Sequence, residues 1–265
     1  MQLYLRPTSL GEALEALGPS GPAPGTLTVL AGGTEVYPAS AGRPLAEDIL
    51  DLAAVPELHG IEECCDHIRI GALATWRDLT DADLPPGFEA LKRVAREIGG
   101  PQIQNTGTVC GNLCGAAPTA DGVPALLALE ARVELSSLHG VTSLPLDSFI
   151  LGERRTALGR DQLMTAVLAP KPAAGARSHF VKLGARSPPV IAIVSAAALV
   201  AGDGAGRVGA ARLAVGACSA LPQRLPALEA ALRGRPLDRA LGAAVEPRHL
   251  AGLEPIEDAR ASADY

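Results

Sequence analysis

Short apolar stretches alternate with polar or glycine-rich segments along the whole chain, and their spacing predicts both strands and helices. Apolar residues at every second position, or in short runs between turn residues, indicate strands. In the first half these strands lie over residues 2–5, 26–30, 48–52 and 67–73. Apolar spacings of three and four residues indicate helices over 10–17, from Thr75 onward and over 88–98.

Residues typical of helix ends support these boundaries. Ser9 and Glu12 have the spacing of a capping box at the first helix. Gly99-Gly100-Pro101 predicts the end of the helix over 88–98. A later helix is expected to end near Glu130, with Pro124 in its first turn, where proline is tolerated.

The second half continues in the same way. A hairpin is predicted over 133–144, followed by strands over 162–168, 180–183 and 207–218 and helices over 225–232 and 237–244. The run of alanine and β-branched residues over 190–200 fits a buried strand or a buried helix, and its periodicity does not decide between them. This mixture of strands and helices indicates an α/β or α+β protein.

Two glycine turns stand out as candidate binding segments. Ala31-Gly32-Gly33-Thr34-Glu35 follows a predicted strand, and the stretch from Gly107 to Leu129 leads into an apolar helix. Glycine lets a backbone approach a ligand closely, and free N–H groups near a helix start favour an anion such as phosphate. The first turn taken alone also fits an ordinary tight turn.

The composition excludes several classes of function. Apolar residues make up 48% of the 265 residues, as in a folded protein. The net charge is −6 and aromatic residues make up only 3%, which argues against binding to nucleic acid or to an anionic membrane surface. No apolar run approaches the roughly 20 residues of a spanning helix. The N-terminus does not resemble a signal peptide. We therefore expect a cytoplasmic protein without membrane insertion.

The five cysteines do not predict a metal site. Their odd number fits a reducing compartment better than a disulfide framework. Cys110 and Cys114 form a C-x3-C pair and Cys64 and Cys65 are adjacent, but no second pair has ligand spacing. The five histidines are scattered along the chain. Buried small thiols are favoured over a metal or cluster site, and the histidines are interpreted as surface or structural residues.

The ordered motifs of this chain resemble one known family. They include Ala31–Thr34, the segment from Asp51 to Ile61, and Arg69–Thr75. The block from Pro101 to Asp121, the segments Phe180–Leu183 and Ile191–Ser195, and the final Asp258–Tyr265 follow in the same order. Together they resemble the FAD-binding (medium) subunit of molybdenum hydroxylases, the group that includes aerobic carbon monoxide dehydrogenase and xanthine dehydrogenase. The resemblance covers essentially the whole chain.

The resemblance implies a fold and a domain division. The fold would be α+β, with a FAD-binding domain of the vanillyl-alcohol oxidase (PCMH) type over residues 1–172. Its two α/β subdomains would cover about 1–55 and 56–172. A smaller α+β C-terminal domain would cover 176–265, after the Pro/Gly/Ala-rich segment 171–177. FAD would lie extended between the two subdomains.

The resemblance also implies which residues bind FAD. Those of the first turn, expected to wrap the diphosphate, are Val29, Leu30, Ala31, Gly32, Gly33, Thr34, Glu35 and Val36. A second loop would contain Thr108, Val109, Cys110, Gly111 and Asn112, of which Cys110 stands where the family usually has glycine. Ile98 would line the cofactor wall and Asp121 would bond a polar part of FAD, while Met164 and Lys182 match later contacts. Asp121 as a plain helix cap and Lys182 as a solvated strand residue are the alternatives.

The implied function is electron transfer within a larger enzyme. Substrate would be oxidised at a molybdenum cofactor on a large subunit, and electrons would pass through two 2Fe-2S clusters on a small subunit to FAD on this chain. NAD, oxygen or a quinone would then reoxidise the flavin. No residue is assigned as a catalytic acid, base or nucleophile, nor as a metal ligand. The alternatives are a self-contained flavin oxidoreductase of the same fold and a flavin-free scaffold subunit. Relatives usually continue past the final segment into a last helix, which this chain lacks.

Overall fold

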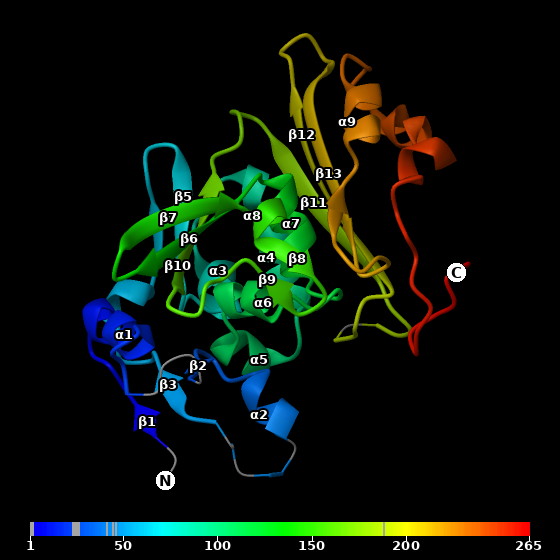
Figure 1. Ribbon diagram of the computed structural model, residues 1–265. Helices are drawn as coiled ribbons and strands as arrows, with labels where there is room; N and C mark the ends of the chain where they lie inside the picture. Colours follow the sequence, from blue (N-terminus) through cyan, green and yellow to red (C-terminus); the bar gives the residue numbers. More distant parts are fainter. Residues whose placement is uncertain (1–2, 23–26, 41, 44, 46, 188) are drawn as a thin grey trace.

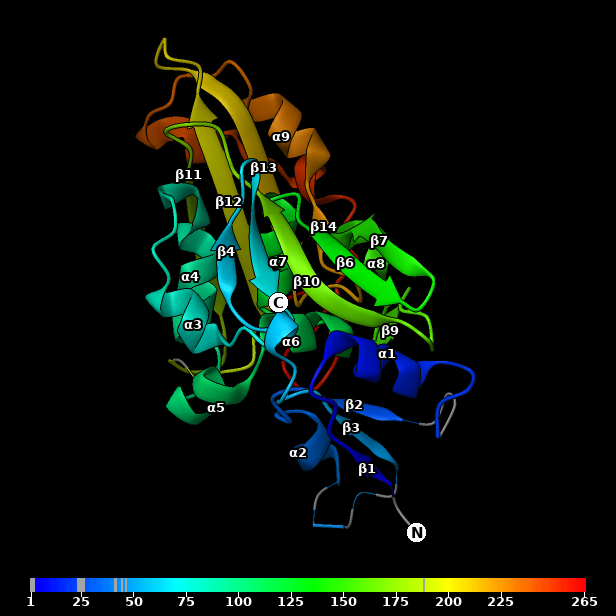
Figure 2. The same ribbon diagram turned by 90° about the vertical axis from the view of Figure 1, so that its left-hand side faces the viewer.

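Three main sheets and the helices between them build the molecule (Figures 1 and 2). The computed structural model describes residues 3–22, 27–40, 42–43, 45, 47–187 and 189–265. The first residue of each of the strands predicted over 2–5 and 26–30 lies outside these residues. The α+β fold expected from the sequence is confirmed.

The N-terminal subdomain is a small parallel sheet with two helices. Its strands lie in the order β1 (Tyr4–Leu5), β3 (Ile49–Asp51) and β2 (Thr28–Leu30). Helix α1 (Leu10–Leu17) begins at Ser9, whose hydroxyl accepts the Glu12 N–H as predicted. The rest of the predicted capping box is wrong, because the Glu12 carboxylate accepts the N–H and hydroxyl of Thr8 instead.

The next part is a five-stranded antiparallel sheet that curves around helices. In sheet order its strands are β4 (Ile61–Glu63), β5 (His67–Gly71), β10 (Leu163–Pro170), β6 (Arg132–Ser137) and β7 (Gly140–Pro145). The last two form the predicted hairpin. A 3-10 turn, η1 (Pro56–Leu58), leads into this sheet, and α8 (Leu146–Phe149) with the short pair β8 (Ile150–Gly152) and β9 (Arg155–Thr156) follows the hairpin.

A row of helices fills the long connection between β5 and β6. They are α3 (Trp76–Asp81), η2 (Pro86–Phe88), α4 (Glu89–Glu97), α5 (Pro101–Thr106), α6 (Val109–Gly115) and α7 (Gly122–Ala128). Thr75 and Asp78 cap α3 with a complete capping box. The predicted stop after α4 holds, but Pro101 also begins α5, because its fixed φ suits a first helical turn.

The C-terminal part is a four-stranded antiparallel sheet with the order β11 (Arg177–Leu183), β12 (Val194–Gly202), β13 (Val208–Gly216) and β14 (Gln223–Arg224). Of the run that fitted both a strand and a helix, residues 194–200 belong to β12, in which buried and half-buried residues alternate, and residues 190–193 precede the strand. Helix α9 (Pro226–Leu232) follows as predicted. The helix predicted over 237–244 is instead the 3-10 helix η3 (Arg239–Ala244), and η4 (Pro247–Leu250) comes after it.

The two faces of the C-terminal sheet contact different partners. Its inner face packs Phe180, Leu199 and Ala214 into the main core, against α4 and α7. Its outer face forms a smaller core with Leu228 and Leu232 of α9. Figures 1 and 2 show α7 between this sheet and the five-stranded sheet. Helix α7 is buried along its whole length, so it fixes the position of one part of the chain relative to the other.

A charged network adds to this contact at the end of α7. The Glu130 carboxylate pairs with Arg212 at 2.6 Å and with Arg224 at 2.8 Å, and Arg224 also pairs with Glu229 at 2.6 Å. The hydrogen bond from Arg212 is the largest cause that holds the pKa of Glu130 below its ordinary value. Glu130 adopts a positive φ of 54°, a conformation that costs a residue with a side chain about 1 kcal/mol.

We predict that Glu130→Gln lowers the free energy of unfolding at pH 7 by about 1 kcal/mol. This value is at the upper end of what partly exposed ion pairs contribute to stability. Because folding lowers the pKa of Glu130, its contribution is present above the unfolded value of 4.5 and is lost as pH falls through the folded value. Urea unfolding at pH 7 and at successively lower pH should show the gap between variant and wild type closing. Glu62→Gln, at an exposed position, is the control and should show no gap at either pH.

Candidate functional site

The two glycine turns predicted from the sequence lie against each other. A Cβ placed on Gly32 would lie 1.7 Å from the carbonyl oxygen of Thr106, and one on Gly107 would lie 3.3 Å from Thr34 Oγ1. A Cβ on Gly115 would lie 2.3 Å from the carboxylate of Glu35. The first distance is impossible for a real side chain, so backbone touches backbone where the N-terminal subdomain meets the helices α5 and α6.

The first turn presents unpaired backbone donors. Gly33 has a φ of 68°, and its carbonyl accepts the Tyr37 N–H, which begins the short helix α2 (Val36–Ser40). Among the described residues, the N–H groups of Gly32, Gly33, Thr34 and Glu35 donate to no other group. Consecutive free N–H groups at a tight turn form a concave site suited to an anion.

The second turn proves to be the start of a helix. Thr108 is the N-cap of α6, and its hydroxyl accepts the Gly111 N–H at 3.0 Å. Cys110, which stands where the family usually has glycine, lies within α6 and has no positive φ, so its Cβ strains no left-handed backbone. Its side chain is buried in the core, where burial raises the pKa of the thiol well above its ordinary value.

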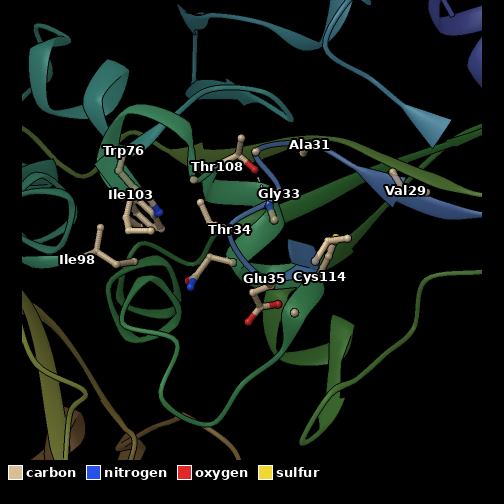
Figure 3. Close-up of a pocket in the computed structure, with 16 residues that line it drawn as sticks. Val29, Ala31, Gly33, Thr34, Glu35, Trp76, Ile98, Ile103, Thr108 and Cys114 are labelled. Carbon is tan, nitrogen blue, oxygen red and sulfur yellow. Dashed lines mark hydrogen bonds between the residues drawn. The ribbon is translucent and has the colours of Figure 1, made fainter. Parts of the chain in front are cut away.

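A cavity of about 420 Å³ lies between the two turns. In Figure 3, Thr34, Glu35 and Ile98 are among the side chains drawn around it. A second cavity of about 400 Å³ shares Glu35, Ile98 and Asn112 with the first and extends toward Asp121 and the loop after β11. Because the cavities share these walls, we describe them as one elongated cleft.

The far end of the cleft holds a buried ion pair. Lys182 of β11 donates to Asp121 Oδ2 at 2.7 Å and to the carbonyl of Glu97 at 3.2 Å, and its side chain is only 1% exposed. Burial raises the pKa of Asp121, while the hydrogen bond and charge of Lys182 act in the opposite direction. Asp121 stands at the N-cap of α7 without capping it, so the plain-cap alternative is wrong, as is a solvated Lys182.

Two acceptor atoms in this cleft lack partners. Among the described residues, Asn112 Oδ1 and Asp121 Oδ1 are the buried side-chain oxygens or nitrogens that make no hydrogen bond. A buried polar atom without a hydrogen-bond partner lowers the stability of the folded state by about 1–3 kcal/mol. Such atoms are therefore expected at sites where a bound ligand supplies the missing hydrogen bond. Both residues line the second cavity, so a ligand group with hydrogen-bond donors that binds there would complete these sealed oxygens only if their side chains turned toward it.

The structure brings together most of the residues selected from the sequence. Those that line the first cavity are Val29, Ala31, Gly32, Gly33, Thr34, Glu35, Val36, Ile98, Thr108, Gly111 and Asn112. Asp121 lines the second cavity, and Lys182 contacts it through Asp121. Leu30, Val109, Cys110 and Met164 are buried in the protein and line neither cavity.

Sequence reasoning missed five residues of the first cavity, which are Trp76, Ile103, Gly107, Cys114 and Gly115. Gly107, Cys114 and Gly115 belong to the stretch already singled out, so its helical period could have indicated them. Trp76 and Ile103 carried no such signal because they enter from α3 and α5. Cys114 lines the cavity and is exposed there. Desolvation by the surrounding protein, with a smaller effect of the Glu35 carboxylate, raises the pKa of its thiol.

The described residues contain no group of three or more His, Cys, Asp or Glu side chains that could hold a metal ion. Within the same residues no helix is long and apolar enough to cross a membrane. All five cysteines are free thiols.

Comparison with known proteins assigns the chain to a family. Residues 1–172 match the family described as the FAD binding domain in molybdopterin dehydrogenase, and residues 179–265 match the CO dehydrogenase flavoprotein C-terminal domain. The chain belongs to this family. It is therefore a flavoprotein subunit of an oxidoreductase of the molybdenum hydroxylase type, and its cofactor is FAD.

Individual relatives agree with this assignment. The chain is 33% identical to the nicotinate dehydrogenase FAD-subunit of Eubacterium barkeri, over 79% of this chain and 72% of the relative. It is 28% identical to the carbon monoxide dehydrogenase medium chain of Hydrogenophaga pseudoflava, over 99% and 90%. A solved structure of the enzyme from that organism, lacking the Mo-pyranopterin moiety, gives a TM-score of 0.90 at 30% identity, covering 100% of this chain and 91% of the other. Quinoline 2-oxidoreductase of Pseudomonas putida 86 gives 0.87 at 26%, covering 100% and 90%.

We predict that Gly32→Ala lowers the free energy of unfolding of this flavoprotein subunit by about 1–3 kcal/mol or more. The new methyl group cannot be placed without moving the backbone of Thr106, since the three atoms nearest to it all belong to the main chain. Urea unfolding measures the loss. Gly242→Ala is the control, because its Cβ would enter open space. Equal stability of the two variants would contradict the close contact between the turns.

We predict that Lys182→Met costs about 3–5 kcal/mol at pH 7, because it leaves the Asp121 carboxylate buried without its cation. The pKa of Asp121, already raised above 3.8, should rise further. A carboxyl group whose pKa is raised by folding destabilises the folded state as pH rises from the unfolded toward the folded value, so the deficit should shrink as pH falls. Lys171→Met removes the exposed pair with Glu63 and should cost at most about 1 kcal/mol at either pH. Urea unfolding at two pH values checks both.

Proposed function

We propose that this subunit binds FAD along the elongated cleft and uses it to carry electrons between partner subunits and an external acceptor. The observation that carries the proposal is the match between the cleft and the two chemically different ends of a dinucleotide. One end offers free N–H donors and no side-chain bulk, and the other offers buried acceptors without partners.

The diphosphate would lie between the two turns. Backbone N–H groups of Gly32 to Glu35 would donate to its oxygens, and the N-terminus of α6 would add a favourable dipole. Thr108, Gly111 and Asn112 form the opposite wall. Val29, Ala31 and Val36 would surround the neighbouring sugar and chain atoms. Leu30, Val109, Cys110 and Met164 would support these walls from the core without touching the cofactor through their side chains.

The flavin ring would lie at the Asp121 end. The N3–H of the isoalloxazine is a donor that can complete Asp121 Oδ1, and a polar group beside it can complete Asn112. Lys182 would keep Asp121 ionised and aimed at the ring. Ile98 supplies apolar surface for one side of the ring. This end of the cleft extends to Arg186 and to residues 189–191, where a redox partner would approach.

The cofactor supplies the redox chemistry, accepting and releasing electrons, while the protein positions it and excludes water. We propose that the electrons come from two 2Fe-2S clusters on a small partner subunit and that substrate is oxidised at the molybdenum cofactor of a large one. NAD, oxygen or a quinone would be the final acceptor. Relatives named as medium chains of dehydrogenases support a heterotrimer or its dimer. The titratable groups that line the cleft include no His, so no acid or base is assigned.

The domain division and the location remain parts of this proposal. Residues 1–172, with subdomains of about 1–55 and 56–172, would form the FAD-binding domain, and 176–265 the C-terminal domain. The two family matches and the separate sheets support it. A cytoplasmic location is supported by five free thiols.

We predict that the full chain binds one FAD, seen as a flavin absorption band that remains with the protein after gel filtration. Gly111→Val should weaken this binding roughly tenfold or more, because its side chain would enter the cavity beside Thr108 Oγ1. Titration of each protein with FAD, followed by the change in flavin absorbance, measures both affinities. Circular dichroism checks that the variant folds.

Three outcomes separate the alternatives. A colourless chain that cannot be reconstituted would support a flavin-free scaffold and contradict the proposal. Flavin binding with full turnover of an organic substrate by the isolated chain would support a self-contained oxidoreductase. Flavin binding without such turnover, restored by the partner subunits, is the result that we expect.

A further inference from the structure

Trp76 is the only tryptophan of the chain, and the family assignment gives it no role. It is the first residue of α3 and is just 2% exposed, yet it lines the cavity between the two glycine turns. Figure 3 shows its side chain close to those of Ile103 and Ile98 at the cavity wall. A buried indole commonly has a hydrogen-bond partner for its N–H.

Among the described residues, the indole N–H of Trp76 donates a hydrogen bond to no other group. Unlike Asn112 Oδ1 and Asp121 Oδ1, which are unpaired and sealed from solvent, the indole nitrogen is not sealed. The nitrogen therefore keeps some accessible surface, and the open space beside this residue is the cavity that Trp76 lines. A donor held in this way is expected to be completed by a ligand.

The ring is held rigidly in place. The backbone N–H of Trp76 donates to the carbonyl of Gly107 at 3.1 Å, and the Thr75–Asp78 capping box fixes the start of α3. A Cβ on Gly122 would lie 2.8 Å from the far edge of the indole, and one on Gly107 would lie 3.5 Å from Cδ1. Gly122 thus leaves space that the ring fills, while Gly107 lies in ordinary contact distance of its other edge. The N–H is therefore oriented before any ligand arrives.

We propose that Trp76 donates its indole N–H to an oxygen of the diphosphate or the adjoining sugar chain of bound FAD and so positions the cofactor. This inference rests on the proposed binding of FAD. The acceptor belongs to that section of FAD because Trp76 lines the cavity between the turns and not the cavity that contains Asp121. Trp76 adds a side-chain donor to the backbone donors of the first turn.

The first test uses the single indole N–H resonance of the full chain, labelled with the heavy nitrogen isotope. On addition of FAD this resonance should shift, and its exchange with solvent deuterium should slow at least tenfold, as expected for a new hydrogen bond to a charged or hydroxyl oxygen. Adenosine diphosphate alone should produce part of the effect, and riboflavin much less. A resonance that keeps its position and exchange rate while flavin absorbance shows FAD bound would overturn the inference and leave the proposed function standing.

The second test uses Trp76→Phe, which keeps an aromatic ring and removes the donor. Its FAD dissociation constant should rise roughly tenfold or more, as for one hydrogen bond to a charged group. Phe88→Leu is the matched control, because Phe88 is fully buried but lines neither cavity. It should lose stability while keeping the wild-type affinity.

Equal FAD affinity in Trp76→Phe and wild type would reject Trp76 as a positioning residue. An equal loss of affinity in Trp76→Phe and Phe88→Leu would show a purely structural effect and would reject it as well. Absence of FAD binding to the wild-type chain would overturn this inference together with the proposed function.

Discussion

The contact between Gly32 and the backbone of Thr106 is the constraint on which the site depends. The two segments approach so closely that no side chain fits between them. This approach joins the small parallel sheet to the helices that follow β5, and it places the first turn and the start of α6 around the same cavity. The anion-binding character of the cleft belongs to neither segment alone, because each supplies only one wall.

Helix α7 extends this organisation to the C-terminal sheet. At its start, Asp121 is paired with Lys182 of β11, and just after its end Glu130 is paired with Arg212 and Arg224. The first pair is buried and lies at the cleft, while the second is partly exposed and lies at the other end of the helix. A buried pair adds little net stability but fixes geometry, because separating its charges is costly. The C-terminal sheet therefore takes part in shaping the cofactor end of the cleft.

The polar groups of the cleft divide into those already satisfied and those left for a ligand. Lys182 has two acceptors, and Thr108 accepts the Gly111 N–H. Asn112 Oδ1, Asp121 Oδ1 and the Trp76 indole N–H have none among the described residues. The two ends of the cleft therefore differ chemically. Hydrogen-bond donors without partners lie toward the first turn, and acceptors without partners lie toward Asp121. An elongated ligand with an anionic centre and a donor-bearing ring fits this arrangement.

The sequence by itself determined features that depend on neighbouring residues. Ser9 and Thr75 start helices, Gly99 ends one, and the glycine turns lie where strand and helix patterns meet, because capping and positive φ are local properties. Family resemblance added Asp121 and Lys182 as binding candidates. Their partnership could not be read from the sequence, since 61 positions separate them.

Only the tertiary structure decided the features that depend on packing. Most of the run over 190–200 becomes part of strand β12, from Val194 onward, because β11 and β13 pair with it on both sides. Cys110 points into the core because α6, and not a loop, follows Thr108. Trp76 reaches the cleft because α3 packs beside the second turn, which no periodicity of its own segment encodes. Long-range contacts decided these cases, since a short apolar pattern is compatible with several neighbours and the folded chain selects one.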